Sequence, residues 1–167
     1  MAAEMEHIPC KEQQQNDRVV CELNLDAIVR RKPQLVVVDD LAHTNAKGSR
    51  HRRRFQDVEE ILRAGIDVYT TADIQNIESL NDLVASITGK VVKDRIPDSL
   101  FDHADQVELI DIEPQEVLAR LNQKAENEGK QETGQNILTI PILTALREMA
   151  LRRCADRVNR LKEQDSA

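Results

Sequence analysis

The chain has 167 residues, of which 40% are hydrophobic and 32% charged, and its formal net charge is −7. This length fits one domain, and the acidic balance disfavours nucleic-acid binding by the surface as a whole. No apolar run approaches the roughly 20 residues that span a bilayer, and the N-terminus lacks the pattern of a signal peptide. The chain has three cysteines, Cys10, Cys21 and Cys154, and no two of them have Cys-x-x-Cys spacing. An odd number of cysteines without this motif indicates reduced thiols in a cytoplasmic protein.

The first half of the sequence alternates between short aliphatic runs and helical patterns. Residues 34–39 are aliphatic without alternation, which is typical of a strand buried on both faces of a parallel sheet. The elements expected before residue 72 are a flexible N-terminus over residues 1–16, a strand over 18–23, a helix over 25–32 with Asn24 as its N-cap, the strand over 34–39, a helix over 55–65 and a strand over 66–71.

The second half continues this alternation. The elements expected there are a helix over residues 74–89, strands over 91–96 and 107–112, a helix that begins at Pro114, a polar linker over 122–136 and a final helix over 142–164. An apolar stripe on the final helix is expected to cover the sheet; it consists of Leu143, Leu146, Ala150, Cys154, Val158 and Leu161. The pattern predicts an α/β domain over residues 17–121, with a parallel sheet flanked by helices, and a C-terminal helix within 137–167 that packs on or follows it.

Polar side chains follow the strand over residues 34–39, at the sheet edge where parallel α/β proteins bind ligands. An aliphatic strand that ends in aspartate is similar to a Walker B strand, in which a carboxylate helps to hold the magnesium of a bound nucleotide. Asp39 is the predicted magnesium ligand if a nucleotide binds. The candidate nucleotide-binding or anion-binding residues are Asp39, Asp40, His43, Thr44, Asn45, Gly48, Ser49, Arg50 and His51.

Simpler interpretations of this loop stay open. Either aspartate can cap the next turn, and the run Arg52–Arg54 can be a solvated surface. The residues Asp39, Asp40, His43 and His51 also admit a metal cluster, although their spacing matches no ligand signature.

A Walker A loop, which supplies the backbone amides and the lysine that hold nucleotide phosphates, is absent from this sequence. None of the five glycines precedes Gly48, and neither Gly89-Lys90 nor Gly129-Lys130 is followed by Ser or Thr. The sequence therefore does not assign a cofactor, and ATP with magnesium is the candidate to be tested.

Several runs together resemble a known family. They are DDLAHTN at 39–45, GSRH at 48–51, FQDVEE at 55–60, AGIDVYTT at 64–71, ESLND at 78–82, ITGKVVKDRIPD at 87–98 and LTALREMALRRCADRV at 143–158. They resemble the cytoplasmic N-terminal domain of the KdpD potassium-sensor histidine kinases of bacteria, over about residues 17–121 and 137–160. Asp40 stands where the family has Glu, Phe55 where it has Trp, and Asp73 and Asn76 where it usually has Asn and His.

The resemblance implies a P-loop-like α/β domain that carries a nucleotide site and regulates a kinase core in a two-component potassium or osmotic response. The family's P-loop segment is expected before residue 1, and the kinase core is not in this sequence. We therefore expect a stand-alone or truncated regulatory domain that is not an enzyme by itself and acts with a protein partner. The alternatives are a nucleotide-binding domain whose Walker A half is supplied elsewhere, and a vestigial fragment.

A strand over residues 34–39 that lacks the P-loop strand beside it becomes the edge of the sheet. Either the strand over 18–23 or a second copy of the chain is expected to cover this edge. The second arrangement predicts a homodimer.

Overall fold

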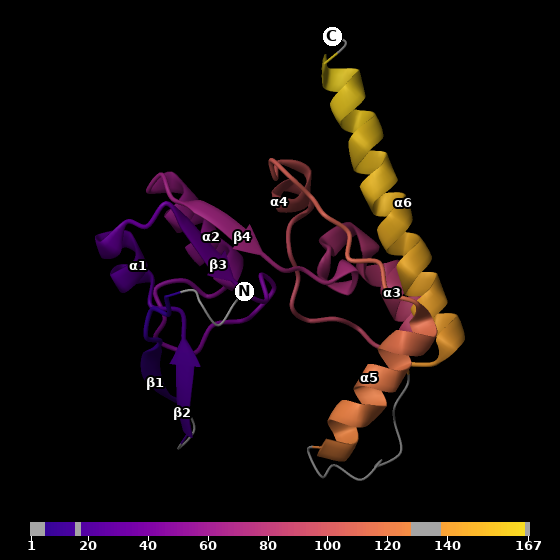
Figure 1. Cartoon of the computed structure of the whole chain (residues 1–167), viewed down its shortest axis with the longest axis horizontal. Helices are drawn as coiled ribbons and strands as arrows, with labels where there is room; N and C mark the ends of the chain where they lie inside the picture. Colours follow the sequence, from indigo (N-terminus) through magenta and orange to yellow (C-terminus); the bar gives the residue numbers. More distant parts are fainter. Residues whose placement is uncertain (1–5, 16–17, 128–137, 166–167) are drawn as a thin grey trace. The chain divides into compact units, whose positions relative to one another are not determined.

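The computed structural model describes residues 6–15, 18–127 and 138–165 (Figure 1). The chain divides into two compact units, Met1–Asp73 and Ile74–Ala167. The elements of the first unit are β1 (Lys11–Gln15), β2 (Arg18–Glu22), α1 (Leu25–Arg31), β3 (Leu35–Val38), α2 (Arg54–Arg63) and β4 (Asp67–Thr70). Those of the second are the 3₁₀ helices η2 (Ile74–Asn76) and η3 (Glu78–Leu80) and the α-helices α3 (Asn81–Thr88), α4 (Asp98–Asp102), α5 (Pro114–Asn127) and α6 (Ile140–Asp165).

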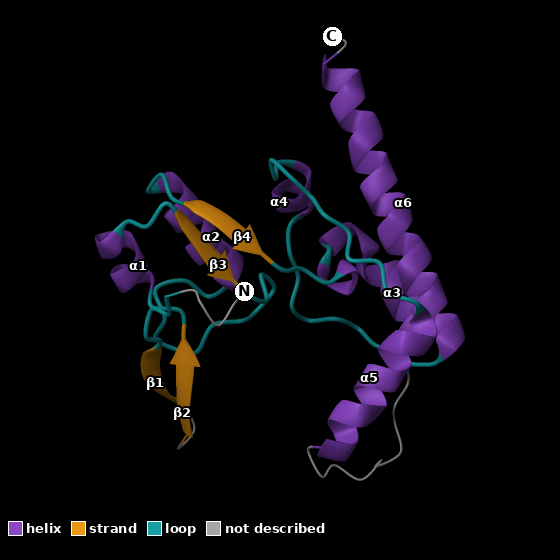
Figure 2. Cartoon of the chain, in the orientation of Figure 1, coloured by secondary structure: helices purple, strands orange, loops and turns teal. Residues whose placement is uncertain are grey.

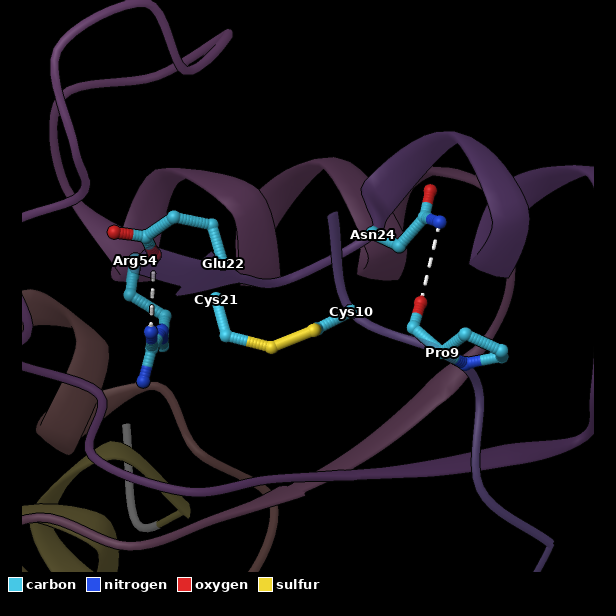
Figure 3. The surroundings of a disulfide bond; sticks show 6 residues. All are labelled: Pro9, Cys10, Cys21, Glu22, Asn24 and Arg54. Carbon is cyan, nitrogen blue, oxygen red and sulfur yellow. Dashed lines mark hydrogen bonds and ion pairs between the residues drawn. A yellow bond between two sulfur atoms is a disulfide. The ribbon is translucent and has the colours of Figure 1, made fainter. Parts of the chain in front are cut away.

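The first unit begins with a β-hairpin. Residues 11–15, which were expected within a flexible N-terminus, form β1 and pair antiparallel with β2, with Glu12 opposite Cys21. A disulfide joins Cys10 to Cys21, whose Cα atoms are 5.5 Å apart (Figure 3). The prediction of reduced thiols is therefore wrong for these two residues, whereas Cys154 is free. The strand register brings the two cysteines together, and spacing along the sequence does not reveal that register.

The parallel sheet has two strands in the described residues (Figure 2). β3 and β4 confirm the strands predicted over 34–39 and 66–71, and Val37 lies opposite Tyr69. Val38 is 3% exposed, but Val37 is 54% and Tyr69 63% exposed. The prediction of a strand buried on both faces is therefore wrong. The strand predicted over 18–23 is present as β2, but it pairs with β1, and within the described part of the chain no strand lies at the outer edge of β3.

The two helices of this unit follow from local signals in the sequence. The Asn24 side chain caps α1 by accepting a hydrogen bond from the backbone N of Ala27 at 3.1 Å. Helix α2 buries Val58 and Ile61 and is followed by Gly65, whose φ of 75° favours glycine. Both predicted helices are confirmed.

The second unit departs from the sequence pattern between residues 74 and 112. Instead of one helix over 74–89, it has η2, η3 and the shorter helix α3. The cause is a competing segment: Ile96 N donates to Asn76 O at 2.7 Å, and Glu78 N donates to Ile96 O at 3.0 Å. These bonds use backbone groups that a continuous helix needs. The strands predicted over 91–96 and 107–112 do not form, and Ile96 makes a single bridge with Ile77.

Helices α5 and α6 lie close to their predicted positions. Pro114 begins α5, as predicted, but the helix continues to Asn127 and so enters the predicted linker, of which residues 128–136 lie outside the described residues. The final helix is confirmed as α6. Arg147 of α6 binds Asp111 through Nε at 2.6 Å and Glu113 through Nη1 at 2.9 Å, and its hydrogen bond holds the pKa of Asp111 below the ordinary value.

Ion pairs also hold α6 against α4. Arg153 donates to Asp102 at 2.7 Å and to Asp98 at 3.3 Å, and it lies over the Phe101 ring at 4.5 Å. Burial acts to raise the pKa of Asp98, but hydrogen bonds from Ser79 and the charge of Arg153 outweigh it and lower that pKa. This face of α6 is therefore fixed by charged groups.

The disulfide gives a prediction about stability. We expect Cys21→Ser to lower the free energy of unfolding of the first unit by about 2–3 kcal/mol, because the unfolded chain loses a cross-link across a short loop. The measurement is thermal unfolding without reductant, with Cys154→Ser as the matched control, since Cys154 is outside the disulfide. A reductant should lower the midpoint of the wild-type chain and leave that of Cys21→Ser unchanged. An unchanged wild-type midpoint would contradict the prediction.

Candidate functional site

The predicted site residues occupy the loop between β3 and α2. Asp39 directly follows β3, and its Oδ1 accepts a hydrogen bond from Thr71 Oγ1. The same Thr71 hydroxyl accepts a hydrogen bond from the backbone N of Asp40 at 2.9 Å. Since Thr71 directly follows β4, these bonds join the carboxyl ends of the two parallel strands. Asp40 has a φ of 55°, in the left-handed region, where the chain turns away from the sheet.

A buried carboxylate beneath the loop was missed by the sequence analysis. Glu22, at the end of β2, is 6% exposed. Its Oε1 accepts a hydrogen bond from Ala46 N at 2.7 Å and lies 3.2 Å from His43 Nε2. Its Oε2 accepts one from Arg54 Nη2 at 3.3 Å (Figure 3). Arg54 Nη1 also donates to the carbonyl of Asp39 at 3.0 Å. Glu22 therefore ties the hairpin, the loop and the start of α2 together. The sequence feature that could have indicated this role is the position of Glu22, an acidic residue within the apolar run over residues 18–23.

A second buried carboxylate holds the far end of the loop. Asp57 of α2 is 4% exposed. Its Oδ1 lies 2.8 Å from His51 Nδ1, and its Oδ2 accepts a hydrogen bond from Asn45 Nδ2 at 2.5 Å. Asn45 Nδ2 also donates to the carbonyl of His51 at 3.1 Å. Two of the predicted ligand-binding side chains thus bind a neighbouring helix.

The remaining predicted donors also have partners within the unit. Arg50 forms ion pairs with Asp26 and Glu60. Ser49 Oγ accepts a hydrogen bond from Gln13 Nε2 at 3.1 Å. Thr44 receives a hydrogen bond from Arg53 and forms a backbone bridge with it. Gly48 has a φ of 102° and shapes the turn. The loop is consequently a network of internal contacts.

The metal interpretation is not supported by this geometry. His43 Nδ1 lies 3.9 Å from Asp40 Oδ2, but His51 is directed to Asp57 and Glu60 instead. Within the part of the chain that the structure describes, no three His, Cys, Asp or Glu side chains lie close enough together to hold a metal ion.

Two cavities adjoin the loop. The larger, about 220 Å³, is lined by Ile8, Cys10, Cys21, Glu22, Leu23, Asn24, Ile28, Val37, Val38, Asp39 and Arg54. It lies below the roughly 300–1,000 Å³ of most ligand pockets. Asn45, Ser49 and Arg50 line only the smaller cavity, about 20 Å³, which has room for about one water molecule. Of the predicted site residues, Asp39 alone lines the larger cavity, so neither of these two cavities brings the predicted residues together around a ligand.

Arg54 distinguishes the larger cavity. Its side chain is 15% exposed, and its Nε is buried without a hydrogen-bond partner in the described residues. The cavity therefore combines the Arg54 side chain, the Asp39 carboxylate and an apolar wall.

The Glu22 contacts predict a large effect of mutation. We expect Glu22→Ala to lower the free energy of unfolding of the first unit by about 3 kcal/mol, because it leaves the largely buried Arg54 guanidinium and the amide of Ala46 without their carboxylate partner. The measurement is urea unfolding followed by the fluorescence of Tyr69, the single tyrosine of the chain. Glu12→Ala on the exposed face of β1 is the matched control and should change stability little. An equal effect of the two variants would remove Glu22 from this role.

Known proteins resemble this chain over most of its length. The family model of the KdpD osmosensitive K+ channel His kinase sensor domain matches residues 1–158. The sensor protein KdpD of Clostridium acetobutylicum is 51% identical over 154 residues, and that of Escherichia coli K12 is 47% identical over 154 residues. Each of these alignments covers 91% of this chain and 17% of the relative.

A third relative agrees with the first two. The sensor protein KdpD of Mycobacterium tuberculosis H37Rv is 48% identical over 137 residues, which are 81% of this chain and 16% of that protein. The chain therefore spans about one sixth of the length of these relatives. None of the helices that the structure describes has the length and apolar character needed to cross a membrane. On these matches, the chain belongs to the KdpD family of osmosensitive K+ channel histidine kinase sensor domains.

Proposed function

We propose that this chain is a cytoplasmic regulatory segment of a potassium-responsive two-component sensor, without catalytic activity of its own. The observation that carries the proposal is the sensor-domain match over residues 1–158. The relatives are named as sensor proteins, and the chain aligns with a small part of each. A segment of this kind acts by changing the activity of the kinase core to which it is coupled. The protein partner of that kinase core is a response regulator, which receives its phosphate.

The contacts of the loop favour regulation over chemistry. A catalytic base or nucleophile needs a reacting atom within hydrogen-bond reach in an accessible site. His43 lies against Glu22, His51 against Asp57, and Arg50 between Asp26 and Glu60. These pairs hold the loop in one conformation, which suits a surface that is recognised by another protein.

The regulatory role is tested in a complete sensor. The 154 aligned residues of the Escherichia coli relative would be replaced by the corresponding residues of this chain, and phosphorylation of the response regulator would be followed at low and high potassium. We expect the chimera to keep at least half of the potassium dependence of the parent, because the two segments are 47% identical.

Two controls make this test specific. A sensor from which the aligned segment is deleted should lose the potassium dependence. The isolated chain, incubated with labelled ATP, should acquire no phosphate. A folded chimera with the parent's kinase activity but no response to potassium would contradict the regulatory proposal, and a labelled chain would contradict its non-catalytic part.

Nucleotide binding is the second candidate function, and one observation favours it. Asp39 follows β3 at the carboxyl end of a parallel strand pair and lines the 220 Å³ cavity together with Arg54. This is the edge at which P-loop-like sheets bind ligands. A carboxylate is a suitable oxygen ligand for magnesium, so Asp39 is the residue that would hold the ion of a magnesium–ATP complex. The phosphate cradle would then come from outside the present sequence.

Thermal unfolding with millimolar Mg-ATP or Mg-ADP decides between binding and no binding by this chain. A nucleotide at about 100 times its dissociation constant adds roughly 2.7 kcal/mol to the free energy of unfolding. If the nucleotide proposal holds, Asp39→Asn removes the shift and Asp67→Asn, an exposed aspartate at the other end of the strand pair, keeps it. An absent shift, or one that survives Asp39→Asn, removes Asp39 from nucleotide binding.

The outer edge of β3 is the surface that we propose for a protein partner. Its backbone groups have no strand neighbour in the described residues, and the adjacent face carries Leu35, Val37 and Tyr69, which are 38%, 54% and 63% exposed. Open edges of this kind recruit strands from other chains. A homodimer through this edge stays a prediction.

A further inference from the structure

The disulfide of the first unit is exposed and lies at one end of the β-hairpin. Cys10 directly precedes β1, so it lies just beyond the strand pair, whose terminal register joins Lys11 to Glu22. Since Glu12 lies opposite Cys21, Cys10 is a diagonal neighbour of Cys21 on the same face of the hairpin. Both cysteines are exposed to solvent. A dissolved thiol can therefore reach their sulfur atoms.

The same disulfide holds one wall of the larger cavity. Residues 6–10, which we call the N-terminal strap, precede β1, and Cys10 attaches them covalently to β2. The half-buried Ile8 and Cys10 of the strap line the 220 Å³ cavity, as do Cys21 and Asp39. The strap therefore forms one side of the cavity that the Asp39 carboxylate adjoins.

The other polar contacts of the strap are weak ones. Asn24 Nδ2 donates to the carbonyl of Pro9 at 3.2 Å, and Arg31 forms an ion pair with Glu6 (Figure 3 shows the first of these). Both contacts are exposed, and exposed pairs of this kind contribute little to stability. Ordering the strap costs backbone entropy at every residue, which one half-buried isoleucine does not offset. The disulfide is thus the main restraint on the strap.

We propose that Cys10 and Cys21 form a thiol–disulfide exchange site, and that reduction releases the N-terminal strap from the cavity beside Asp39. The five registered pairs of β1 and β2 do not include Cys10, so the hairpin itself stays paired when the bond is broken. The change is local: the strap moves, Ile8 leaves the cavity wall, and the cavity opens to solvent.

The exchange proceeds in two steps and uses two molecules of a small thiol such as glutathione. In the first step a glutathione thiolate attacks one cysteine sulfur, the Cys10–Cys21 bond breaks, and the other sulfur leaves with the electron pair and takes a proton. In the second, another glutathione thiolate attacks the glutathione sulfur of the mixed disulfide and releases the second cysteine as a thiol. The cysteine pair gains two electrons, and the two glutathione molecules are oxidised to one disulfide.

The choice of glutathione rests on the cytoplasmic location in the proposed function, because disulfides in that compartment are usually transient or redox-sensing. Exchange and release of the strap are measured on the purified chain, without a kinase core. A failure here therefore leaves the test with the chimeric sensor unaffected, and the reverse also holds.

The experiment is a titration of the full chain with buffers of reduced and oxidised glutathione, in a Cys154→Ser background that removes the free thiol. Ile8→Trp supplies the probe, since the sequence has no tryptophan. Alkylation and mass spectrometry give the fraction of reduced pair. We expect reversible reduction in the folded chain. The emission of the introduced tryptophan should move to longer wavelength and its acrylamide quenching constant should at least double, both in step with the reduced fraction.

Two variants serve as controls for the probe. Val19→Trp places a tryptophan on β2 of the same hairpin, at a position that is 66% exposed and does not line the cavity, so its quenching should not change on reduction. Adding Cys10→Ser/Cys21→Ser to the Ile8→Trp chain should give the reduced-state emission at every glutathione ratio.

A second measurement uses the natural residue at position 8. A glutamyl endopeptidase cleaves after Glu6, which lies in the strap, and a protease needs a locally released segment. We expect cleavage at Glu6 to be at least fivefold faster in the reduced chain than in the oxidised chain.

Three outcomes overturn the proposal. The first is a pair that stays oxidised in excess reduced glutathione for as long as the chain is folded. The second is a reduced pair with unchanged tryptophan quenching and unchanged cleavage at Glu6, which would make the bond a static cross-link. The third is a loss of the far-ultraviolet circular dichroism on reduction, which would mean unfolding of the unit and not release of the strap.

Discussion

The first unit depends on the burial of one carboxylate, that of Glu22. A buried charge is tolerated only when it is paired and its lone pairs are used, and otherwise it costs several kcal/mol. Glu22 meets this condition with partners from three parts of the chain: the amide of Ala46, the ring of His43 and the guanidinium of Arg54. The requirement to satisfy one side chain therefore sets the position of the hairpin, the conformation of the loop and the start of α2 together. The disulfide acts on the same strand, because Cys21 directly precedes Glu22.

This constraint changes the meaning of the polar loop. A run of Asp, His, Asn, Ser and Arg after an aliphatic strand is typical of a phosphate site, yet here Asn45 and His51 bind Asp57, and Arg50 binds Asp26 and Glu60. Atoms already committed to a helix or to a neighbouring loop offer little to a ligand without a rearrangement that breaks their pairs. Within the described residues, Arg54 Nε is buried without a hydrogen-bond partner, and Arg54 lines the same cavity as Asp39. The paired side chains of the loop thus stabilise the first unit, and they are poorly placed to bind a substrate or to take part in catalysis.

Sequence reasoning succeeded where the cause is local. The Asn24 cap, the Gly65 stop and the Pro114 start each depend on the conformation of a few adjacent residues. It failed where a distant segment competes for the same backbone groups, as Ile96 does at the helix predicted over 74–89. The same distinction applies to the candidate site. The sequence pattern located the loop correctly, because the loop directly follows a predicted strand. The partners of its side chains, Glu22, Asp26 and Asp57, come from β2, α1 and α2, and no local sequence pattern identifies them.

Helix α6 shows the strongest departure from the usual distribution of side chains. In an amphipathic helix the apolar stripe is normally buried and the charged face solvated. Here Arg153 and Arg157 are buried, with carboxylates, an aromatic ring and carbonyl oxygens as partners, while Leu151 and Val158 are about half exposed. Long arginine stems cover apolar surface while their guanidinium groups bind α4 and the backbone that follows it, and Met149 is the apolar residue buried on the same face. Val158 belongs to the stripe predicted for packing, so the buried face of α6 differs from the predicted one. The exposed side chains Leu151 and Val158 therefore contribute little hydrophobic free energy to the folding of this unit.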